Sequence, residues 1–315
     1  MAQSSAVNPV LRIGSRGSPL ALAQAHEVRN RLAAAARLDA ERIEIKIIRT
    51  SGDAIQDRPL AEAGGKGLFT KEIEEALLSK TVDLAVHSSK DMPTVLPAGL
   101  LLAGFLPRED PRDAFISRKA KSWRELPAGA VIGTASLRRQ AQLKRLRSDL
   151  AVVPLRGNVE TRLRKLEAGE VDATILAVAG LKRLGLLAAV TAILDPDEFL
   201  PAVGQGAIGI ETRGDDAQTR ALVALIDDAD SATALAAERA FLAVLDGSCR
   251  TPIGGHAEVN GATLRFRGLI VRPDGGEAYD VMREGRREQA AALGADAGHE
   301  LRARAGAGFF DFARV

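Results

Sequence analysis

Strand and helix patterns alternate through about the first 200 residues of this 315-residue chain, and that alternation limits the possible folds more than any other feature. The segment RIEIKIIRT places Ile43, Ile45 and Ile47 on one face, which is the two-residue period of a strand. The segment SPLALAQAHEVRNRLAAAAR begins with Ser18 as a helix N-cap and Pro19 at the first helical position. We therefore expect an α/β fold for this region.

A weak internal repeat bears on how this region is divided. EEALLSKTVDLAV (74–86) resembles LRKLEAGEVDATILAV (163–178), and each combines a helix, a polar turn, a Val-Asp pair and a buried strand. Two domains of similar construction would explain the repeat, but the same pattern is common in any α/β protein. The proline-bearing segments 105–115 and 195–206 are expected to cross between two domains.

The last third of the chain has a different pattern. An alanine-rich helix is expected from about Ser231. Strands then alternate around Asn-Gly and Asp-Gly-Gly turns, and a last helix is expected at about 286–305. This pattern predicts a separate, smaller α+β domain with an antiparallel sheet.

Composition excludes several classes of protein. The formal net charge of +2 excludes a globally basic nucleic-acid binder. No apolar run approaches the roughly 20 residues of a membrane span. The first residues, MAQSSAVNPV, have neither the pattern of a secretory signal nor the arginines of a transit peptide. A single cysteine fits a reducing compartment, so we expect a cytoplasmic protein that binds neither nucleic acid nor membrane.

Positive charge is nevertheless concentrated in residues 131–165, which hold nine Lys or Arg against two acidic residues. A solvated helix face accounts for Lys144, Arg147 and Lys165. The remaining arginines stand at turns where a strand meets a helix, in VIGTASLRR and VVPLRGNVETRL, and RIGSRGSPLA repeats the design near the start. Such turns present free backbone N–H groups, and guanidinium binds carboxylates and phosphates through paired hydrogen bonds. They predict an anionic ligand at the carboxyl ends of the strands.

Other kinds of site are poorly supported. GGKG (64–67) lacks the spacing of a P-loop, and no GxGxxG follows a strand. No aromatic residue lies between 131 and 165, which disfavours base stacking there. No metal site is expected, because the four histidines are dispersed: His26, His87, His256 and His299.

Two residues could carry chemistry beside this anion site. Asp91, in VHSSKDMPT, follows a strand and could stabilise a cation or transfer a proton, or it could simply cap a turn. Cys249, in LDGSCRTPIGG, could be a small buried side chain, or a thiolate nucleophile and covalent attachment point favoured by the neighbouring Arg250. The residues alone leave both pairs of alternatives open.

Eight segments together resemble the porphobilinogen deaminase family, also called hydroxymethylbilane synthases. They are RIGSRGSPLALAQA, GGKGLFTKEIE, AVHSSKDMPT, GTASLRRQAQL, LRGNVETRL, LAVAGLKRLG, VGQGAIGIE and GSCRTPIGG. The resemblance extends from about Leu11 to the last helix. It implies a deaminating transferase of tetrapyrrole and haem biosynthesis. The family enzyme condenses four porphobilinogens head to tail, releases ammonia at each step and hydrolyses off the linear tetrapyrrole hydroxymethylbilane.

The resemblance also implies roles for individual residues. A dipyrromethane cofactor would be attached to Cys249 through a thioether. Asp91 would be the catalytic aspartate, which stabilises the azafulvenium cation left when ammonia departs. Residues expected to bind the carboxylates of cofactor and substrate are Arg16, Ser18, Lys90, Thr134, Ser136, Arg138, Arg139, Arg156 and Arg162. Further substrate contacts are expected from Lys66, Ser88, Arg183 and Gln24. Some relatives have a lysine where this chain has Glu62, ahead of GGKG.

The implied fold has two α/β domains like the type II periplasmic binding proteins, with an active-site cleft between them, and a smaller C-terminal α+β domain. We place the first domain at residues 1–106 plus 207–224, with Asp91. The second lies at 107–206 and offers the basic face. The third lies at 225–315 and carries Cys249. A monomer is expected, with porphobilinogen as the small-molecule substrate and uroporphyrinogen III synthase as a pathway partner only.

Two other functions compete with this one. A non-catalytic binding protein for an anionic solute could share the architecture, but it would need neither Asp91 nor Cys249 and usually carries a secretion signal. A nucleic-acid binder built on the helix at 136–147 is disfavoured by the lack of aromatic residues and by the modest net charge.

Overall fold

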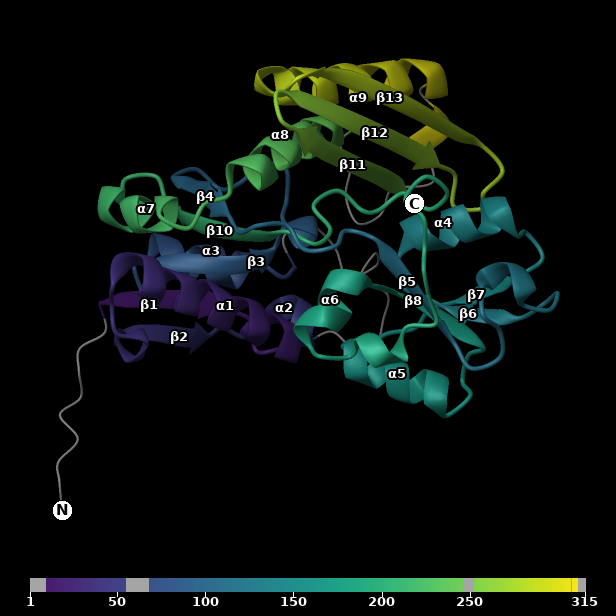
Figure 1. The fold of residues 1–315 in the computed structure, drawn as a ribbon, viewed down its shortest axis with the longest axis horizontal. Helices are drawn as coiled ribbons and strands as arrows, with labels where there is room; N and C mark the ends of the chain where they lie inside the picture. Colours follow the sequence, from purple (N-terminus) through teal and green to yellow (C-terminus); the bar gives the residue numbers. More distant parts are fainter. Residues whose placement is uncertain (1–9, 55–67, 246–251, 307, 311–315) are drawn as a thin grey trace.

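The computed structural model describes residues 10–54, 68–245, 252–306 and 308–310, and these form three sheets. In Figure 1 two five-stranded sheets lie side by side, and a three-stranded sheet with its helices lies across the top of both. Short 3-10 turns join the elements at Ala40–Arg42, Ser89–Asp91, Trp123–Glu125, Leu187–Ala189 and Arg287–Gln289.

The first sheet is mixed, with strand order β2-β1-β3-β10-β4. Its strands are β1 (Leu11–Ser15), β2 (Ile43–Ile47), β3 (Leu84–Ser88), β4 (Leu100–Phe105) and β10 (Ile208–Arg213). Its helices are α1 (Pro19–Ala36), α2 (Ser51–Ala54), α3 (Lys71–Leu78) and α7 (Ala217–Ala224). Strands β1, β2 and β3 are parallel, whereas β10 runs antiparallel to both β3 and β4. Helix α1 buries Val28 and Leu32, and the sheet buries Ile13 and Leu84.

The second sheet has the order β7-β6-β8-β5-β9. Its strands are β5 (Asp113–Ser117), β6 (Val131–Gly133), β7 (Ala151–Val153), β8 (Ala173–Ala177) and β9 (Ala192–Ile193). Its helices are α4 (Leu137–Leu146), α5 (Val159–Glu167) and α6 (Val178–Arg183). Strands β6, β7 and β8 are parallel, and β5 is antiparallel to β8. Residues 106–112 and 194–207 therefore connect one sheet to the other.

The internal repeat corresponds to equivalent positions in the two sheets. The pairs α3–β3 and α5–β8 each place their strand at the centre of a five-stranded sheet. The Val-Asp pair acts identically in both: Asp83 Oδ2 accepts a hydrogen bond from the backbone N of Arg12 (2.8 Å), and Asp172 Oδ2 accepts one from the backbone N of Val131 (2.7 Å). Each aspartate thus joins the turn before the central strand to the start of its parallel neighbour.

The C-terminal part packs two helices against an antiparallel sheet. Its elements are α8 (Ala229–Val244), β11 (Ile253–Asn260), β12 (Thr263–Val271), β13 (Ala278–Arg286) and α9 (Ala290–Ala305). The rings of Phe241 and Phe266, both fully buried, lie 5.0 Å apart at the centre of this core. Gly294 lets α9 approach α8 closely, because a Cβ there would lie 1.9 Å from the carbonyl oxygen of Ala237.

These elements confirm the predicted fold class of two α/β domains and a smaller C-terminal α+β domain. Two details differ from the sequence interpretation. Ile47 is 59% exposed, because it ends β2 at the edge of its sheet. The last helix begins at Ala290 rather than at about 286, since β13 continues to Arg286. The exact domain boundaries stay predictions. No helix among the described residues is long and apolar enough to cross a membrane.

Candidate active site

The three predicted strand-end turns all form, and their polar side chains cap helices. Ser18 Oγ accepts a hydrogen bond from the backbone N of Ala21 (3.3 Å) at the start of α1. Ser136 caps α4 by accepting from the backbone N of Arg139 (3.4 Å), and buried Thr134 accepts from the backbone N of Ser136 (3.2 Å). A hydroxyl that accepts a hydrogen bond still has a proton to donate, so capping leaves these groups able to bind an anion.

Lys90 and Asp91 stand in the short turn that directly follows β3. Asp91 is exposed and Lys90 is half-buried. Burial lowers the pKa of Lys90 to about 8. The carboxylates of Asp91 and Asp113 raise this pKa, whereas the guanidiniums of Arg138 and Arg139 lower it. Charged groups of the first and second sheets therefore act on one another across their boundary.

Arg162 extends this cluster from α5. Its Nε donates to the carbonyl oxygen of Gly157 (2.8 Å), within the turn that precedes the helix. Burial lowers the pKa of Arg162 to about 10, and the positive charges of Arg139 and Arg156 lower it as well. Asp91 has the opposite effect on this pKa, so the carboxylate from the first sheet lies within electrostatic range of arginines from the second.

Arg138 and Arg139 are almost fully buried, with 6% and 5% of their surface exposed, and both pair with Asp113. Arg138 Nη2 donates to Asp113 Oδ2 (2.7 Å). Arg139 donates to Asp113 Oδ1 from Nη2 (2.7 Å) and from Nε (3.1 Å). Their other hydrogen bonds among the described residues go to the carbonyl oxygens of Leu200 and Ile175. Two cations thus share one carboxylate, which leaves an excess of positive charge.

Four further predicted residues lie around the same strand ends. Gln24 Nε2 donates to Ser88 Oγ (2.9 Å), at the end of β3. The Arg16 guanidinium lies 4.1 Å from the centre of the Phe69 ring. Arg183 Nη2 donates to the carbonyl oxygen of Gly206 (3.0 Å) in the connection between the sheets.

Two predicted residues, Cys249 and Lys66, lie outside the described residues. The described residues on either side of Cys249 end at Leu245 and resume at Pro252. The backbone N of Gly255, near the start of β11, donates to the carbonyl oxygen of Pro201 (2.9 Å). Segment 200–205, which also carries Gln205 against Asp113, therefore lies beside that flank.

Sequence reasoning missed three groups around this site. The sequence did contain a signal for Asp113 as a functional residue, because a charged residue begins an otherwise apolar strand in RDAFIS. Glu238 of α8, fully buried, accepts hydrogen bonds from Arg108 Nη1 (2.5 Å) and from the backbone N of Gly204 (2.7 Å), so it holds both connections between the sheets. Arg239 Nη2 donates to the carbonyl oxygen of Pro93 (2.8 Å), just after Asp91.

Two solvated-face interpretations were incomplete, because Lys144 and Arg147 both donate to backbone carbonyl oxygens, Lys144 Nζ to that of Leu150 (2.5 Å). Arg147 pairs with Asp149, and its Nη1 and Nη2 donate to the carbonyl oxygens of Arg124 (2.9 Å) and Leu126 (3.0 Å). It therefore joins the end of α4 to the segment before β6. Arg145, on the same helix, is exposed.

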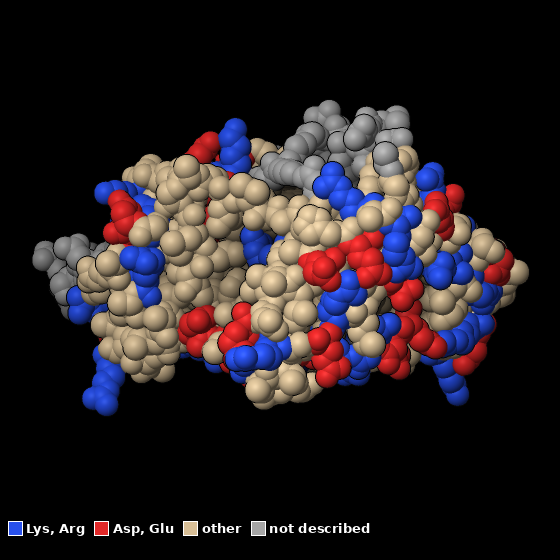
Figure 2. Space-filling view, turned by 90° about the horizontal axis from the view of Figure 1, so that it is seen from above, with Lys and Arg blue, Asp and Glu red and all other residues tan. Residues whose placement is uncertain are grey.

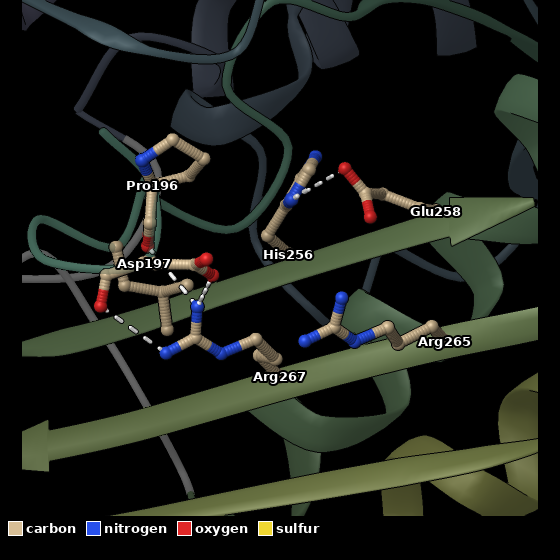
Figure 3. Close-up of a pocket in the computed structure, with 7 residues that line it drawn as sticks. Pro196, Asp197, His256, Glu258, Arg265 and Arg267 are labelled. Atoms are coloured by element: carbon tan, nitrogen blue, oxygen red, sulfur yellow. Dashed lines mark hydrogen bonds and ion pairs between the residues drawn. The ribbon is translucent and has the colours of Figure 1, made fainter. Parts of the chain in front are cut away.

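A small cavity lies where segment 194–200 meets β11 and β12 (Figure 3), and its lining includes Leu200, whose carbonyl oxygen accepts from Arg138. His256 and Glu258 face each other there, with His256 Nδ1 4.0 Å from Glu258 Oε1, and Arg267 pairs with Asp197. Its volume of about 20 Å³ holds about one water molecule and no pyrrole. The contacts across it fasten the C-terminal sheet to the connection between the other two.

Figure 2 shows positive and negative side chains interspersed over one face of the molecule. The described residues form no continuous basic stripe on that face.

Comparison with known proteins identifies two family models in the chain. "Porphobilinogen deaminase, dipyromethane cofactor binding domain" matches residues 11–221, and "Porphobilinogen deaminase, C-terminal domain" matches residues 232–303. A porphobilinogen deaminase of Nitrobacter winogradskyi is 66% identical over 98% of this chain and 98% of its own length. One of Paracoccus denitrificans is 58% identical over 97% of each chain.

Among solved structures, the chain is similar to an ABC transporter periplasmic substrate-binding protein of Coxiella burnetii. The two are 17% identical, the match covers 71% of this chain and 94% of that one, and the TM-score is 0.42. The sequence matches, by contrast, extend over nearly the whole chain, and they favour the transferase over the binding-protein alternative. With two family models and relatives of this identity, the chain belongs to the porphobilinogen deaminase family, the transferases of tetrapyrrole biosynthesis that contain a dipyrromethane cofactor.

Proposed function

We propose that this chain condenses four porphobilinogen molecules head to tail onto a dipyrromethane primer and hydrolyses off the linear tetrapyrrole hydroxymethylbilane. The observation that carries the proposal is the exposed carboxylate of Asp91, in the turn after β3, within electrostatic range of the partly buried cations Lys90 and Arg162. Porphobilinogen has two carboxylates, and each loss of ammonia leaves a cation. Such a substrate requires many positive groups and one well-placed negative one.

The residues present fit the cofactor. Arg138 Nε is buried and has no hydrogen-bond partner among the described residues, and its guanidinium shares its only carboxylate with Arg139. Guanidinium N–H groups suit carboxylate ligands, and a buried donor without a partner is unfavourable. The residues proposed to hold the carboxylates of cofactor and substrate are Arg16, Ser18, Lys90, Thr134, Ser136, Arg138, Arg139, Arg156 and Arg162. When bound, the dipyrromethane supplies the end to which the first substrate is added.

Asp91 is the proposed catalytic residue. It directly follows β3, and the backbone N of Met92 closes its turn by donating to the carbonyl oxygen of Ser89 (3.2 Å). The backbone therefore holds this turn, and the carboxylate is accessible to substrate. Its negative charge would stabilise the cation that forms on porphobilinogen and accept hydrogen bonds from pyrrole N–H groups.

Cys249 is proposed to attach the cofactor through a thioether. The proposal is supported by the described flank at Gly255, which contacts segment 200–205 beside the pair of buried arginines. A durable C–S bond would keep the primer on the protein while the product leaves. Lys66, Ser88, Arg183 and Gln24 are proposed as further substrate contacts. The monomeric state, the cytoplasmic location and uroporphyrinogen III synthase as a pathway partner stay predictions.

The test combines intact mass with turnover. The purified chain, measured under denaturing conditions, should have the mass of the polypeptide plus two linked pyrroles, and it should convert porphobilinogen to hydroxymethylbilane with release of ammonia. A chain at its bare mass that consumes no porphobilinogen, even after prolonged incubation, would contradict the proposed function.

Two arginines of one helix offer a matched comparison. We expect Arg162→Gln to lower the rate of hydroxymethylbilane formation by at least about tenfold, since it removes a half-buried cation near Asp91. Arg164→Gln, two residues further along α5, should leave the rate nearly unchanged, because an isolated exposed charge contributes little. Steady-state assays of both variants decide the matter. Equal losses of rate in Arg162→Gln and Arg164→Gln would mean that the positive charges act only through their summed field.

Lys90 predicts a pH dependence for the cofactor-free chain. Its pKa of about 8 means that the ammonium is charged below this pH and neutral above it. The rate at which the chain acquires dipyrromethane from porphobilinogen, followed by mass, should therefore fall as the pH rises through about 8. Lys90→Arg, which stays charged, should lose this alkaline decline. If the loading rate of Lys90→Arg falls with pH at the same midpoint as that of the wild type, a group other than Lys90 causes the decline.

A further inference from the structure

Asp113 is the buried partner of the two central arginines. It is the first residue of β5, none of its surface is exposed, and it accepts hydrogen bonds from Arg138 and Arg139. Gln205 Nε2 adds another to Oδ1 (2.9 Å) while also donating to the carbonyl oxygen of Pro111 (2.7 Å). Burial alone would raise the pKa of Asp113, but the two guanidiniums hold it well below its usual range. The two guanidiniums therefore favour the charged form of this carboxylate.

The arginines stand where cations are least favoured. They are the second and third residues of α4, within its first turn, and the positive end of a helix dipole repels them. Each also repels the other, and burial lowers the pKa of Arg138. A negative group must compensate them, and the carboxylate of Asp113 does so in the structure.

The geometry of the pair also leaves donors free for a ligand. A guanidinium has five N–H donors. Asp113 and the carbonyl oxygens of Leu200 and Ile175 accept hydrogen bonds from the two groups without using all of these donors, and Arg138 Nε has no partner among the described residues. One carboxylate balances only one of the two positive charges, so the pair stays attractive to an anion from outside.

We infer that Asp113 is a positioning residue, whose buried carboxylate orients Arg138 and Arg139 for the carboxylates of the dipyrromethane and of porphobilinogen. The inference rests on the proposed function of these two arginines. Asp113 itself does not touch the substrate: it acts through the guanidiniums. Gln205, from the connection between the sheets, holds the carboxylate in place.

Asp113→Glu is the principal test, because it keeps the charge and moves it by one methylene. We expect the variant to fold, and the rate at which cofactor-free chain acquires dipyrromethane from porphobilinogen, followed by intact mass, to fall at least about tenfold, since a displacement of about 1 Å can cost about 10²-fold. Asp113→Asn, which removes the negative charge, should lower the loading rate at least as much as Asp113→Glu does. Circular dichroism and Tm report folding.

Asp172→Asn is the matched control. Asp172 belongs to the same sheet domain and pairs with Lys119, but it lies at the other end of its strands from the arginines. Asp172→Asn should lower Tm and leave the loading rate within about twofold of the wild-type rate. The substitution removes interactions that stabilise the fold and none that orient the ligand. If Asp113→Glu loads as fast as the control, the inference is wrong. If neither Asp113 variant folds, Asp113 is a structural residue only, and the inference is equally wrong.

A double-mutant cycle separates positioning from a general loss of structure. Arg139→Lys removes the paired geometry of the guanidinium. If Asp113 acts through Arg139, the variant Asp113→Glu/Arg139→Lys should load about as slowly as the slower single variant, because the same interaction is lost once. If the fold-losses of the two single variants multiply in the double variant, the inference is contradicted. Failure of the wild-type chain to load would contradict the proposed function instead, so the two failures are distinguishable.

Discussion

Asp91→Asn should lower the rate of hydroxymethylbilane formation by about 10²–10³-fold or more, as expected when a main electrostatic stabiliser is removed. Asparagine keeps the shape of the side chain and loses the negative charge. Asp91→Glu keeps the charge and displaces it by one methylene, so it should retain measurable activity even though misplacement by about 1 Å can cost about 10²-fold. Both rates are to be measured on chains whose mass shows a bound cofactor.

The competing explanation makes the opposite forecast. If Asp91 only caps a turn, asparagine should replace it with little loss, because both residues cap turns well. The backbone hydrogen bond between Met92 and Ser89 closes this turn in the structure, so neither variant should disturb the fold. An Asn variant as active as the wild type would leave Asp91 as a turn residue and remove its catalytic role.

Cys249→Ser should abolish cofactor attachment and, with it, all turnover. The hydroxyl of serine is a far weaker nucleophile than a thiolate, and exchanging sulfur for oxygen is a mild change for the fold. Denaturing mass spectrometry should show the bare polypeptide mass, while Tm stays within a few degrees of the Tm of the cofactor-free wild-type chain.

The control for this experiment is a second loop substitution that leaves the thiol in place. Thr251→Ala lies two residues away and should load normally. A Cys249→Ser chain that still carries two pyrroles and turns over would place the attachment point elsewhere. A Thr251→Ala chain that fails to load would show that the loop as a whole, and not its thiol, is required.

Local sequence signals were enough for the elements and for most of the cation cluster. Ser18, Ser136 and Asn158 cap α1, α4 and α5, because a hydroxyl or amide oxygen can accept from the N–H groups of the first turn wherever such a helix forms. Three arginine-bearing turns at strand ends likewise predicted an anion site, which stays a prediction. The boundary errors, at Ile47 and Ala290, came from ends of elements, where neighbouring strands decide how far a pattern continues.

The partners of the charged side chains could not be read from the sequence. Asp113 is separated from Arg138 by 25 residues, and Glu238 from Arg108 by 130. The prediction that Arg147 lies on a solvated face was incomplete for the same reason, since its carbonyl partners lie more than 20 residues earlier. Whether a cation is solvated, paired or available to a ligand depends on burial and on what burial brings beside it.

The sequence by itself therefore determined the α/β class, the third domain and the positions of Asp91 and the arginines at strand ends, because hydrophobic period and capping act over a few residues. Only the tertiary structure decided that Asp91 acts electrostatically on Arg162. It also decided that the one negative charge of Asp113 pairs with two arginines, so that one positive charge is left uncompensated by Asp113. Those relations arise where strands of different sheets end near one another, and electrostatic interactions there depend on distance through space and on exclusion of water.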